Sequence, residues 1–416
     1  MRRPHSLAQR VREAGHTGTV TPPHSLNRPA LVVALALAVS QDILYALIFL
    51  SFMNHYLLDV LDASPGLPGY TLALYGGTRL IVHPIGGRLL DRMGGRMVYS
   101  ASLAVQLLAM IGLAFYQSLA LFLGATVLLA IGAGLIWPLT YALVSATQPS
   151  SQLGRIGGML AVAGYASTGV GFAVGIILAQ LGGGRSAFIA AVVIIAVPAL
   201  SIAGRTLGGG NVHAEHQASA PRPGFSGALL IFAIILFLDF AALSALAGIY
   251  GPYARRTLGL TLLQTTAVLL PAGAAAAVAL AVISRQSRPS RRFLEMALLY
   301  ALAAAGALAL SLTSVPAAAS AVAVVLGLGV GGVSALIAAM MLDAGSGKGR
   351  GVVIGALMSA EGLGGVVGPA TVALVTDLQG PRAGFAVIAA VFAILAPLCL
   401  LAFRHGRPER AAAIPA

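Results

Sequence analysis

The sequence predicts an all-α integral membrane protein in which twelve transmembrane helices form two pseudo-symmetric six-helix bundles. Three observations lead to this prediction: a composition poor in charge, twelve apolar segments, and a polar stretch that divides them into two groups of six. Of the 416 residues, 58% are hydrophobic and 9% are charged. A soluble domain has about a quarter of its residues charged, so the composition excludes a soluble fold.

Twelve segments are apolar and long enough to span the membrane, for which a helix needs about 20 residues. They cover residues 31–57, 69–90, 97–117, 119–147, 154–180, 186–204, 225–250, 258–284, 293–313, 315–342, 351–377 and 383–404. The connections are mostly short, so consecutive helices should be antiparallel neighbours. The many glycines, 51 in all, would let such helices pack closely.

The chain divides into two bundles and three polar parts. A basic tail, residues 1–30, precedes the first bundle, residues 31–204. A stretch rich in Gly, Pro, Ser and His, residues 205–224, predicts a cytoplasmic linker to the second bundle, residues 225–404, and residues 405–416 form a second tail. The first apolar segment continues well past the length of a signal-peptide core and lacks a clear cleavage site, so we interpret the N-terminus as a retained tail.

The distribution of basic residues predicts the orientation of the chain. With both termini in the cytoplasm, twenty of the 25 Lys and Arg residues face the cytoplasm, four face the other side and Arg79 lies within a span. Such a bias is typical of multi-pass membrane proteins. It also argues against nucleic acid as a partner despite the net charge of +13, because the arginines lie between spans rather than on one face. We expect a plasma or inner membrane protein with both termini cytoplasmic.

An internal repeat supports duplicated halves. Residues 171–188 read GFAVGIILAQLGGGRSAF, and residues 368–385, at an offset of 197, read GPATVALVTDLQGPRAGF. The same offset places Asp42 of the first span onto Asp239 of the seventh. Single matches are common in a sequence rich in Gly and Ala, but these matches agree with the two groups of six spans.

A polar motif follows the second span: residues 87–96 read GRLLDRMGGR. It resembles the loop signature between helices two and three of the major facilitator superfamily, Gly-x-Leu-x-Asp-Arg-x-Gly followed by basic residues. The residues that match are Gly87, Leu89, Asp91, Arg92 and Gly94. Gly95 stands where a basic residue is usual.

The resemblance covers residues 31–404 and implies a secondary transporter that works by alternating access. In the family the aspartate of this motif is a charge-pairing partner and helix-end contact that stabilises the outward-facing state. By resemblance, Gly87, Asp91, Arg92, Gly94 and Arg96 form a cytoplasmic gate. Two signatures of drug/proton antiporters in the fourth and fifth spans are absent or incomplete, so the resemblance does not extend to drug export.

The residues of the motif also have a physical interpretation of their own. Gly94 and Gly95 permit a tight reversal with positive φ, and Gly87 would let another helix approach closely. Asp91 and Arg92 lie at the end of the span, where charges reach headgroup water. On this alternative the motif only anchors a loop and sets the topology.

Four ionisable residues lie near the middle of the membrane. They are Asp42, Arg79, Asp239 and Glu361. Asp42, for example, lies about 12 residues into its span, which at 1.5 Å per residue corresponds to roughly 18 Å. A charge at that depth is costly unless it is paired or hydrated, so these residues are the best candidates for a substrate and proton site between the halves.

Three polar side chains share helix faces with these charges. Tyr45 follows Asp42 by three residues, and Tyr75, Arg79 and His83 follow one another at intervals of four residues on one stripe. We include Tyr45 and His83 in the candidate site. His83 is either a proton relay or a hydrogen-bonding group between helices.

The roles of the charges stay open at this point. Asp42 and Arg79 are candidates for a structural ion pair, or each binds substrate. An acid that is protonated while buried in one state and deprotonated in another would couple transport to protons. Three acids against one arginine favour proton or cation handling over anion binding.

No motif for an enzyme, cofactor or metal is present. The chain has no phosphate-binding loop, no His, Cys and acid cluster with metal-ligand spacing, and a single cysteine, Cys399, which excludes an intramolecular disulfide. We expect a monomeric secondary transporter of a small organic molecule, driven by protons, with export preferred because that direction is more frequent in the family. The alternatives are proton-driven uptake of a sugar, organic acid or peptide-like solute, a lipid-modifying membrane enzyme, and a non-transporting receptor.

Overall fold

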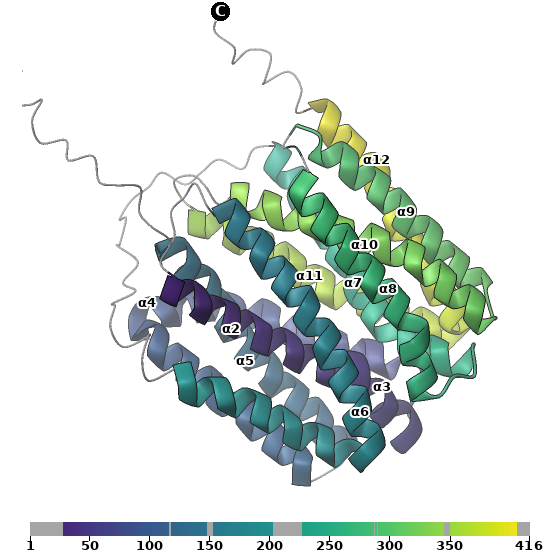
Figure 1. Cartoon of the computed structure of the whole chain (residues 1–416), viewed down its shortest axis with the longest axis horizontal. Helices are drawn as coiled ribbons and strands as arrows, with labels where there is room; N and C mark the ends of the chain where they lie inside the picture. The colour runs from purple at the N-terminus through teal and green to yellow at the C-terminus, as the bar shows by residue number, and fades with distance from the viewer. Residues whose placement is uncertain are drawn as a thin grey trace, which may run out of the picture.

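The computed structural model describes residues 28–115, 118–147, 153–202, 227–286, 288, 290–344 and 350–405. Within these residues all regular secondary structure is helical. The helices pack side by side along one common direction (Figure 1). The predicted linker, residues 205–224, lies outside the described residues, as do residues 1–27 and 406–416.

The first span is one helical rod with two π-helical sections. It consists of α2 (Arg28–Tyr45), η1 (Ala46–Phe52), α3 (Met53–His55) and η2 (Tyr56–Val60). π-helical sections are rare in proteins and often occur at functional sites. Here η1 begins directly after Tyr45, a predicted site residue.

The helix α4 (Leu67–Phe115) contains the second and third predicted spans. The chain breaks at Gly94, whose φ of 77° and ψ of 161° are not helical. The positive φ predicted for Gly94 is therefore confirmed, whereas Gly95 is not among the described glycines with positive φ. The close approach predicted at Gly87 is wrong, because a Cβ added to Gly87 would meet no atom within 4 Å. The neighbouring Gly86 is closely packed instead, because a Cβ added to it would lie 3.1 Å from the carbonyl oxygen of Gly134.

The helices α5 (Leu119–Thr147) and α6 (Leu153–Ile202) complete the first half. α6 contains the fifth and sixth predicted spans, and the chain turns between them. The hydroxyl of Ser186 donates to the carbonyl oxygen of Leu178 at 2.6 Å, although residues eight apart in a straight helix are separated by about 12 Å. The reversal falls between the end of the fifth predicted span, residue 180, and the start of the sixth, residue 186.

The described residues of the second half form six helices, one for each predicted span. They are α7 (Gly227–Arg256), α8 (Leu262–Gln286), α9 (Arg292–Leu312), α10 (Pro316–Ala344), α11 (Arg350–Gln379) and α12 (Pro381–His405). In the part of the chain that the structure describes, ten segments are long and apolar enough to cross a membrane. The remaining two spans are the second, which carries Arg79 and Arg88, and the sixth, which is described only to Ile202.

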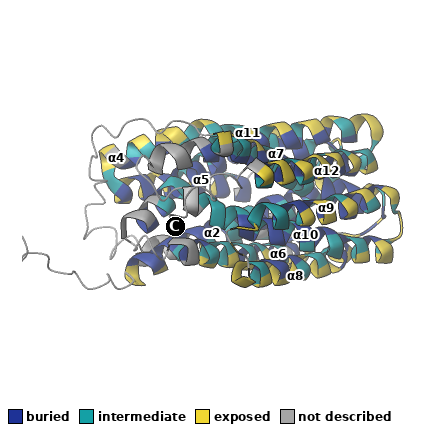
Figure 2. Ribbon diagram, turned by 90° about the horizontal axis from the view of Figure 1, so that it is seen from above, coloured by how far each residue is buried: buried dark blue, intermediate teal, exposed yellow. Residues whose placement is uncertain are grey.

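Most buried side chains fall into two clusters, one in each half of the sequence. The first contains residues between 30 and 191, and the second contains residues between 235 and 399. Large apolar side chains such as Leu181 (81% exposed) and Leu312 (76% exposed) lie on the outside, as expected where lipid is the solvent. Figure 2 shows the buried residues along the inner faces of the helices. Between the halves, α4 and α11 pack most extensively.

Candidate functional site

The six predicted site residues lie on four helices from both halves. Asp42 and Tyr45 belong to α2, Arg79 and His83 to α4, Asp239 to α7, and Glu361 to α11. All six are half-buried. Asp42 lies against the backbone of α6, because a Cβ added to Gly164 would be 2.8 Å from Asp42 Oδ2. A side chain larger than hydrogen at position 164 would displace the carboxylate.

An aromatic group lies beside Arg79. The ring centroids of Tyr45, Phe49 and Tyr75 are 4.7 to 5.7 Å apart. The guanidinium carbon of Arg79 is 5.5 Å from the centroid of Tyr75, within the range of a cation–π interaction. Phe49 was not predicted as a site residue because an apolar aromatic residue in an apolar span carries no distinguishing signal.

The charge of Arg79 acts on acids from both halves. It interacts electrostatically with Asp42 in α2 and with Glu361 in α11. Yet Asp42 and Arg79, both described, form no ion pair within 4.0 Å, whereas Asp59 does so with His55 and Arg255. Asp42 and Arg79 therefore do not form the direct ion pair considered from the sequence.

Several polar atoms near Arg79 are buried without a partner. Arg79 Nε and both ring nitrogens of His83 have no hydrogen-bond partner among the described residues. A buried polar group without a partner is costly in free energy and calls for an explanation such as a ligand or water. Because the guanidinium and the imidazole are one turn apart on α4, they could bind the same ligand group.

Glycines bring α4 and α11 together next to this site. A Cβ at Gly76 would lie 2.5 Å from the carbonyl oxygen of Gly365, and a Cβ at Gly362 would lie 3.1 Å from Leu80 Cδ1. These contacts show that the two helices run antiparallel. Arg79 and Glu361 each lie about one turn from the Gly76–Gly365 crossing, one on each helix.

Asp239 has a different environment from Asp42. The hydroxyl of Tyr300 in α9 donates to Asp239 Oδ1 at 3.0 Å, and Asp239 also interacts electrostatically with Glu361. Tyr300 itself is fully buried. The second half therefore holds a pair of acids together with a phenolic donor.

A polar network that the sequence reasoning missed lies beside Asp42. The amides of Gln41 and Gln106 donate to each other at 3.2 Å, and Gln106 also donates to the hydroxyl of Ser102 at 3.2 Å. Ser102 donates to the carbonyl oxygen of Gly132 at 2.7 Å. All three side chains are buried. Buried amides within apolar spans are the signal that could have revealed them.

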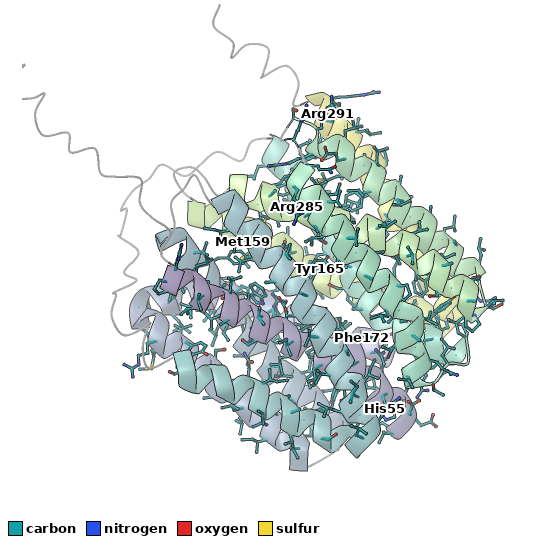
Figure 3. The ribbon with its side chains drawn as sticks, viewed as in Figure 1. His55, Met159, Tyr165, Phe172, Arg285 and Arg291 are labelled. Carbon is teal, nitrogen blue, oxygen red and sulfur yellow. The ribbon has the colours of Figure 1, made fainter. Side chains whose placement is uncertain are left out.

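One hydroxyl contact joins the halves near the middle of the bundle. The hydroxyls of Tyr165 in α6 and Ser334 in α10 are in direct hydrogen-bonding contact. Figure 3 shows Tyr165 between His55 at one end of the bundle and Arg285 and Arg291 at the other. Tyr141 of α5 is a further residue of the candidate site, since it interacts electrostatically with Asp42, Arg79 and Glu361.

The predicted cytoplasmic gate is described only in part. Arg92 and Arg96 are exposed on either side of the break at Gly94, and Gly87 is half-buried. The side chain of Asp91 lies outside the described residues. The gating role of the motif therefore stays a prediction.

The fold and the polar site at its centre define a multi-pass membrane transporter made of two helical halves. The sequence model of the Major Facilitator Superfamily matches residues 30–324 and 232–416, so the chain belongs to this superfamily of secondary transporters. No curated protein sequence matches the chain.

A solved structure with the same fold is that of the human organic anion transporter MFSD10 (TETRAN). The alignment covers 89% of this chain and 99% of that one, with a TM-score of 0.71 and 16% sequence identity. At this identity the likeness is evidence of a shared fold.

Proposed function

We propose that the protein is a proton-coupled transporter that moves a small organic anion across the membrane by alternating access. The observation that carries this proposal is the position of Arg79. It belongs to the first half, it interacts with an acid from each half, and it forms no direct ion pair with either among the described residues. An anionic group of the substrate can therefore reach the guanidinium without first breaking a salt bridge.

The polar atoms around Arg79 support an anionic substrate. Arg79 Nε and the ring of His83 offer hydrogen-bond donors that have no acceptor among the described residues, and guanidinium binds carboxylate or phosphate oxygens in two parallel hydrogen bonds. The rings of Tyr45, Phe49 and Tyr75 would pack against the apolar body of the substrate. The fold shared with an organic anion transporter makes the same class the first to test.

Asp42, Asp239 and Glu361 are the proposed proton carriers. Each is half-buried within a span, where an ionised carboxylate is costly unless a cation or donor stabilises it. When the substrate anion occupies Arg79, the nearby acids lose the stabilisation that Arg79 provides to their ionised forms, so they take up protons. Substrate and proton binding would then favour each other, which is the thermodynamic basis of symport; an antiport cycle follows if substrate and proton occupy Arg79 and the acids in different states.

The remaining features of the mechanism follow the predictions from the sequence. Both termini face the cytoplasm of a cell membrane, the halves move as two units about the central site, and the motif at residues 87–96 closes the cytoplasmic side. We propose export as the physiological direction. Under an inward proton gradient this direction requires the antiport cycle, in which substrate and proton occupy Arg79 and the acids in different states. We propose a monomer as the functional unit.

The test uses purified protein in liposomes that contain a pH-sensitive dye. A panel of small aromatic and aliphatic carboxylates, phosphonates and quaternary amines is added under an imposed pH gradient. The proposal expects proton movement on addition of one or more of the anions, absent from empty liposomes. Proton movement caused only by the amines would replace the anion with a cation as the substrate class, and electrogenic flux of an anion without proton movement would contradict the coupling.

A further inference from the structure

At one end of the bundle, two polar contacts join the first half to the second. This end is where α2 to η2 finish and α4 begins, and the sequence predicts that it faces away from the cytoplasm. One contact is an ion pair between Asp59 of η2 and Arg255 of α7. The other joins Asp377 of α11 to the start of α4. We call them together the outer latch.

The contact of Asp377 completes a helix of the opposite half. Gly66 precedes α4, and its carbonyl oxygen accepts the first helical hydrogen bond, from the amide of Tyr70 at 3.1 Å. Gly66 has no side chain that could cap the exposed amides of the first turn. Asp377 Oδ1 accepts the amide hydrogen of Gly66 at 2.7 Å, and Oδ2 lies 3.5 Å from the hydroxyl of Ser64. A carboxylate at this place also interacts favourably with the helix dipole.

The fit around Asp377 is close enough to require a glycine. A Cβ at Gly66 would lie 2.5 Å from Asp377 Oδ2 and 2.7 Å from the carbonyl oxygen of Ala373. One turn further along α4, a Cβ at Gly69 would lie 2.8 Å from Cβ of Ala373. The start of α4 therefore packs directly against the end of α11.

The ion pair of Asp59 is also supported from both sides. His55, one turn earlier, has its Nδ1 2.6 Å from Asp59 Oδ2. Arg255 donates from Nη1 to the carbonyl oxygen of Leu260 at 3.1 Å, which fixes the guanidinium in its own half. Nearby, a Cβ at Gly251 of α7 would lie 2.6 Å from Cβ of Asn54. Each charge is thus held by its own half and faces the other.

We propose that the outer latch stabilises the state in which this end of the transporter is closed, and that both contacts separate when this end opens. The proposal rests on the alternating access proposed above, but it concerns the balance between two conformations rather than the substrate or the coupling ion. Both contacts join different halves, so a movement that separates the halves at this end breaks both. The expected consequence is that loss of either contact increases the population open at this end.

The test measures distances between spin labels at both ends of the protein. Cys399 is replaced with serine, and labels are attached to Leu181→Cys with Leu312→Cys for the latch end and to Met97→Cys with Ser284→Cys for the opposite end. All four positions are exposed and none belongs to the latch. Electron–electron double resonance on protein in lipid nanodiscs requires no substrate, so a failure to find transport would leave this measurement unaffected.

Asp377→Ala should lengthen the distance at the latch end and shorten the distance at the opposite end, with the ratio of open to closed shifted roughly fivefold. Asp59→Arg, which places two arginines together, should act in the same direction. The double variant Asp59→Arg, Arg255→Asp restores opposite charges and should return the ratio toward that of the parent protein. Asp62→Asn is the matched control and should leave both distances unchanged, because Asp62 is an exposed acid at the same end that forms no hydrogen bond or ion pair with the second half among the described residues.

The outcomes distinguish loss of the latch from misfolding of the variant. If Asp377→Ala and Asp59→Arg remain monodisperse and leave both distance distributions unchanged, the proposal is wrong. If the charge-reversed double variant stays as open as Asp59→Arg alone, the Asp59–Arg255 pair is not part of the latch. A single variant that does not fold is replaced by the double variant, whose return to the closed distance still supports the ion pair.

Discussion

The two halves of the molecule carry an aspartate at matching positions but surround it differently. Asp42 of the first half lies against Gly164. In the second half the position equivalent to Gly164, 197 residues later, is occupied by Glu361, which interacts electrostatically with Asp239. The packing around these positions is otherwise similar. A Cβ at Gly171 would lie 2.8 Å from Cα of Ile43, and one at Gly368 would lie 2.5 Å from Cα of Ala241.

The difference extends to the arginine. The position 197 residues after Arg79 is Ala276, so the first half has a cation that the second half lacks, and the second half has an acid that the first half lacks. Arg79 and Glu361 then interact across the interface between α4 and α11. Duplication accounts for the shared helix packing, and divergence at a few positions produces a site that neither half could form alone.

The largest effect is expected from Asp42, the acid of the first half that interacts electrostatically with Arg79. Asp42→Asn keeps the shape of the side chain but cannot release a proton, so flux driven by a pH gradient should fall to the level of empty liposomes. The measurement is uptake or efflux of an identified substrate in liposomes, with Asp62→Asn as the control. Undiminished flux in Asp42→Asn would mean that the first half contributes no proton carrier.

A second test concerns the glycine that distinguishes the two halves. In Gly164→Ala the new Cβ would lie 2.8 Å from Asp42 Oδ2, and overpacking of this kind costs about 1–3 kcal/mol. Flux should fall roughly tenfold as the carboxylate moves. Gly169→Ala, on the same helix with nothing within 4 Å of its added Cβ, is the matched control. Equal flux in the two variants would show that the position of Asp42 does not matter.

The second half is tested through the phenol that contacts Asp239. Tyr300→Phe removes one hydrogen bond, worth about 1 kcal/mol, so flux should fall about fivefold. Tyr253→Phe is the control, because it also removes a buried hydroxyl of the second half, one that donates to backbone carbonyls of Leu310 and Thr313. We expect this control to lower the thermal stability and to leave the flux unchanged. If both variants reduce flux equally, Tyr300 has no special relation to Asp239.

The smallest effect is expected at the loop motif, which also differs between the halves. The corresponding loop of the second half, residues 285–292, keeps basic residues but has no acid or glycine. Asp91→Asn should reduce turnover about two- to fivefold, the range expected for a charge at a helix end, while the thermal stability is retained. Normal turnover in this variant would limit the motif to anchoring the loop.

Much of the fold could be predicted from the sequence, because lipid as a solvent requires long apolar helices. Composition and segment length predicted the transmembrane helices, and the glycines of the motif predicted the break in the helix at Gly94. Gly87 was misjudged, since which of two adjacent glycines faces the neighbouring helix depends on the rotation of α4 and not on local sequence.

The site could be predicted as a set of charges but not as an arrangement. Asp42, Arg79, Asp239 and Glu361 stand out because charges within apolar spans are rare. Whether two of them form a direct ion pair depends on ångström-scale packing between helices far apart in the chain. The same holds for the network of Gln41 and Gln106 and for the cap that Asp377 provides to α4, since neither has a local signature.

The proposed mechanism depends on the charges at the midplane, which couple substrate movement to protons. The most direct measurement compares two kinds of flux in liposomes containing Asp42→Asn: net flux driven by a pH gradient, and exchange of labelled for unlabelled substrate without a gradient. Exchange should continue while net flux is lost, because the variant still binds and reorients with substrate but carries no proton at this position. If net flux driven by the pH gradient continues at the rate of the unmodified protein, Asp42 does not couple substrate movement to protons.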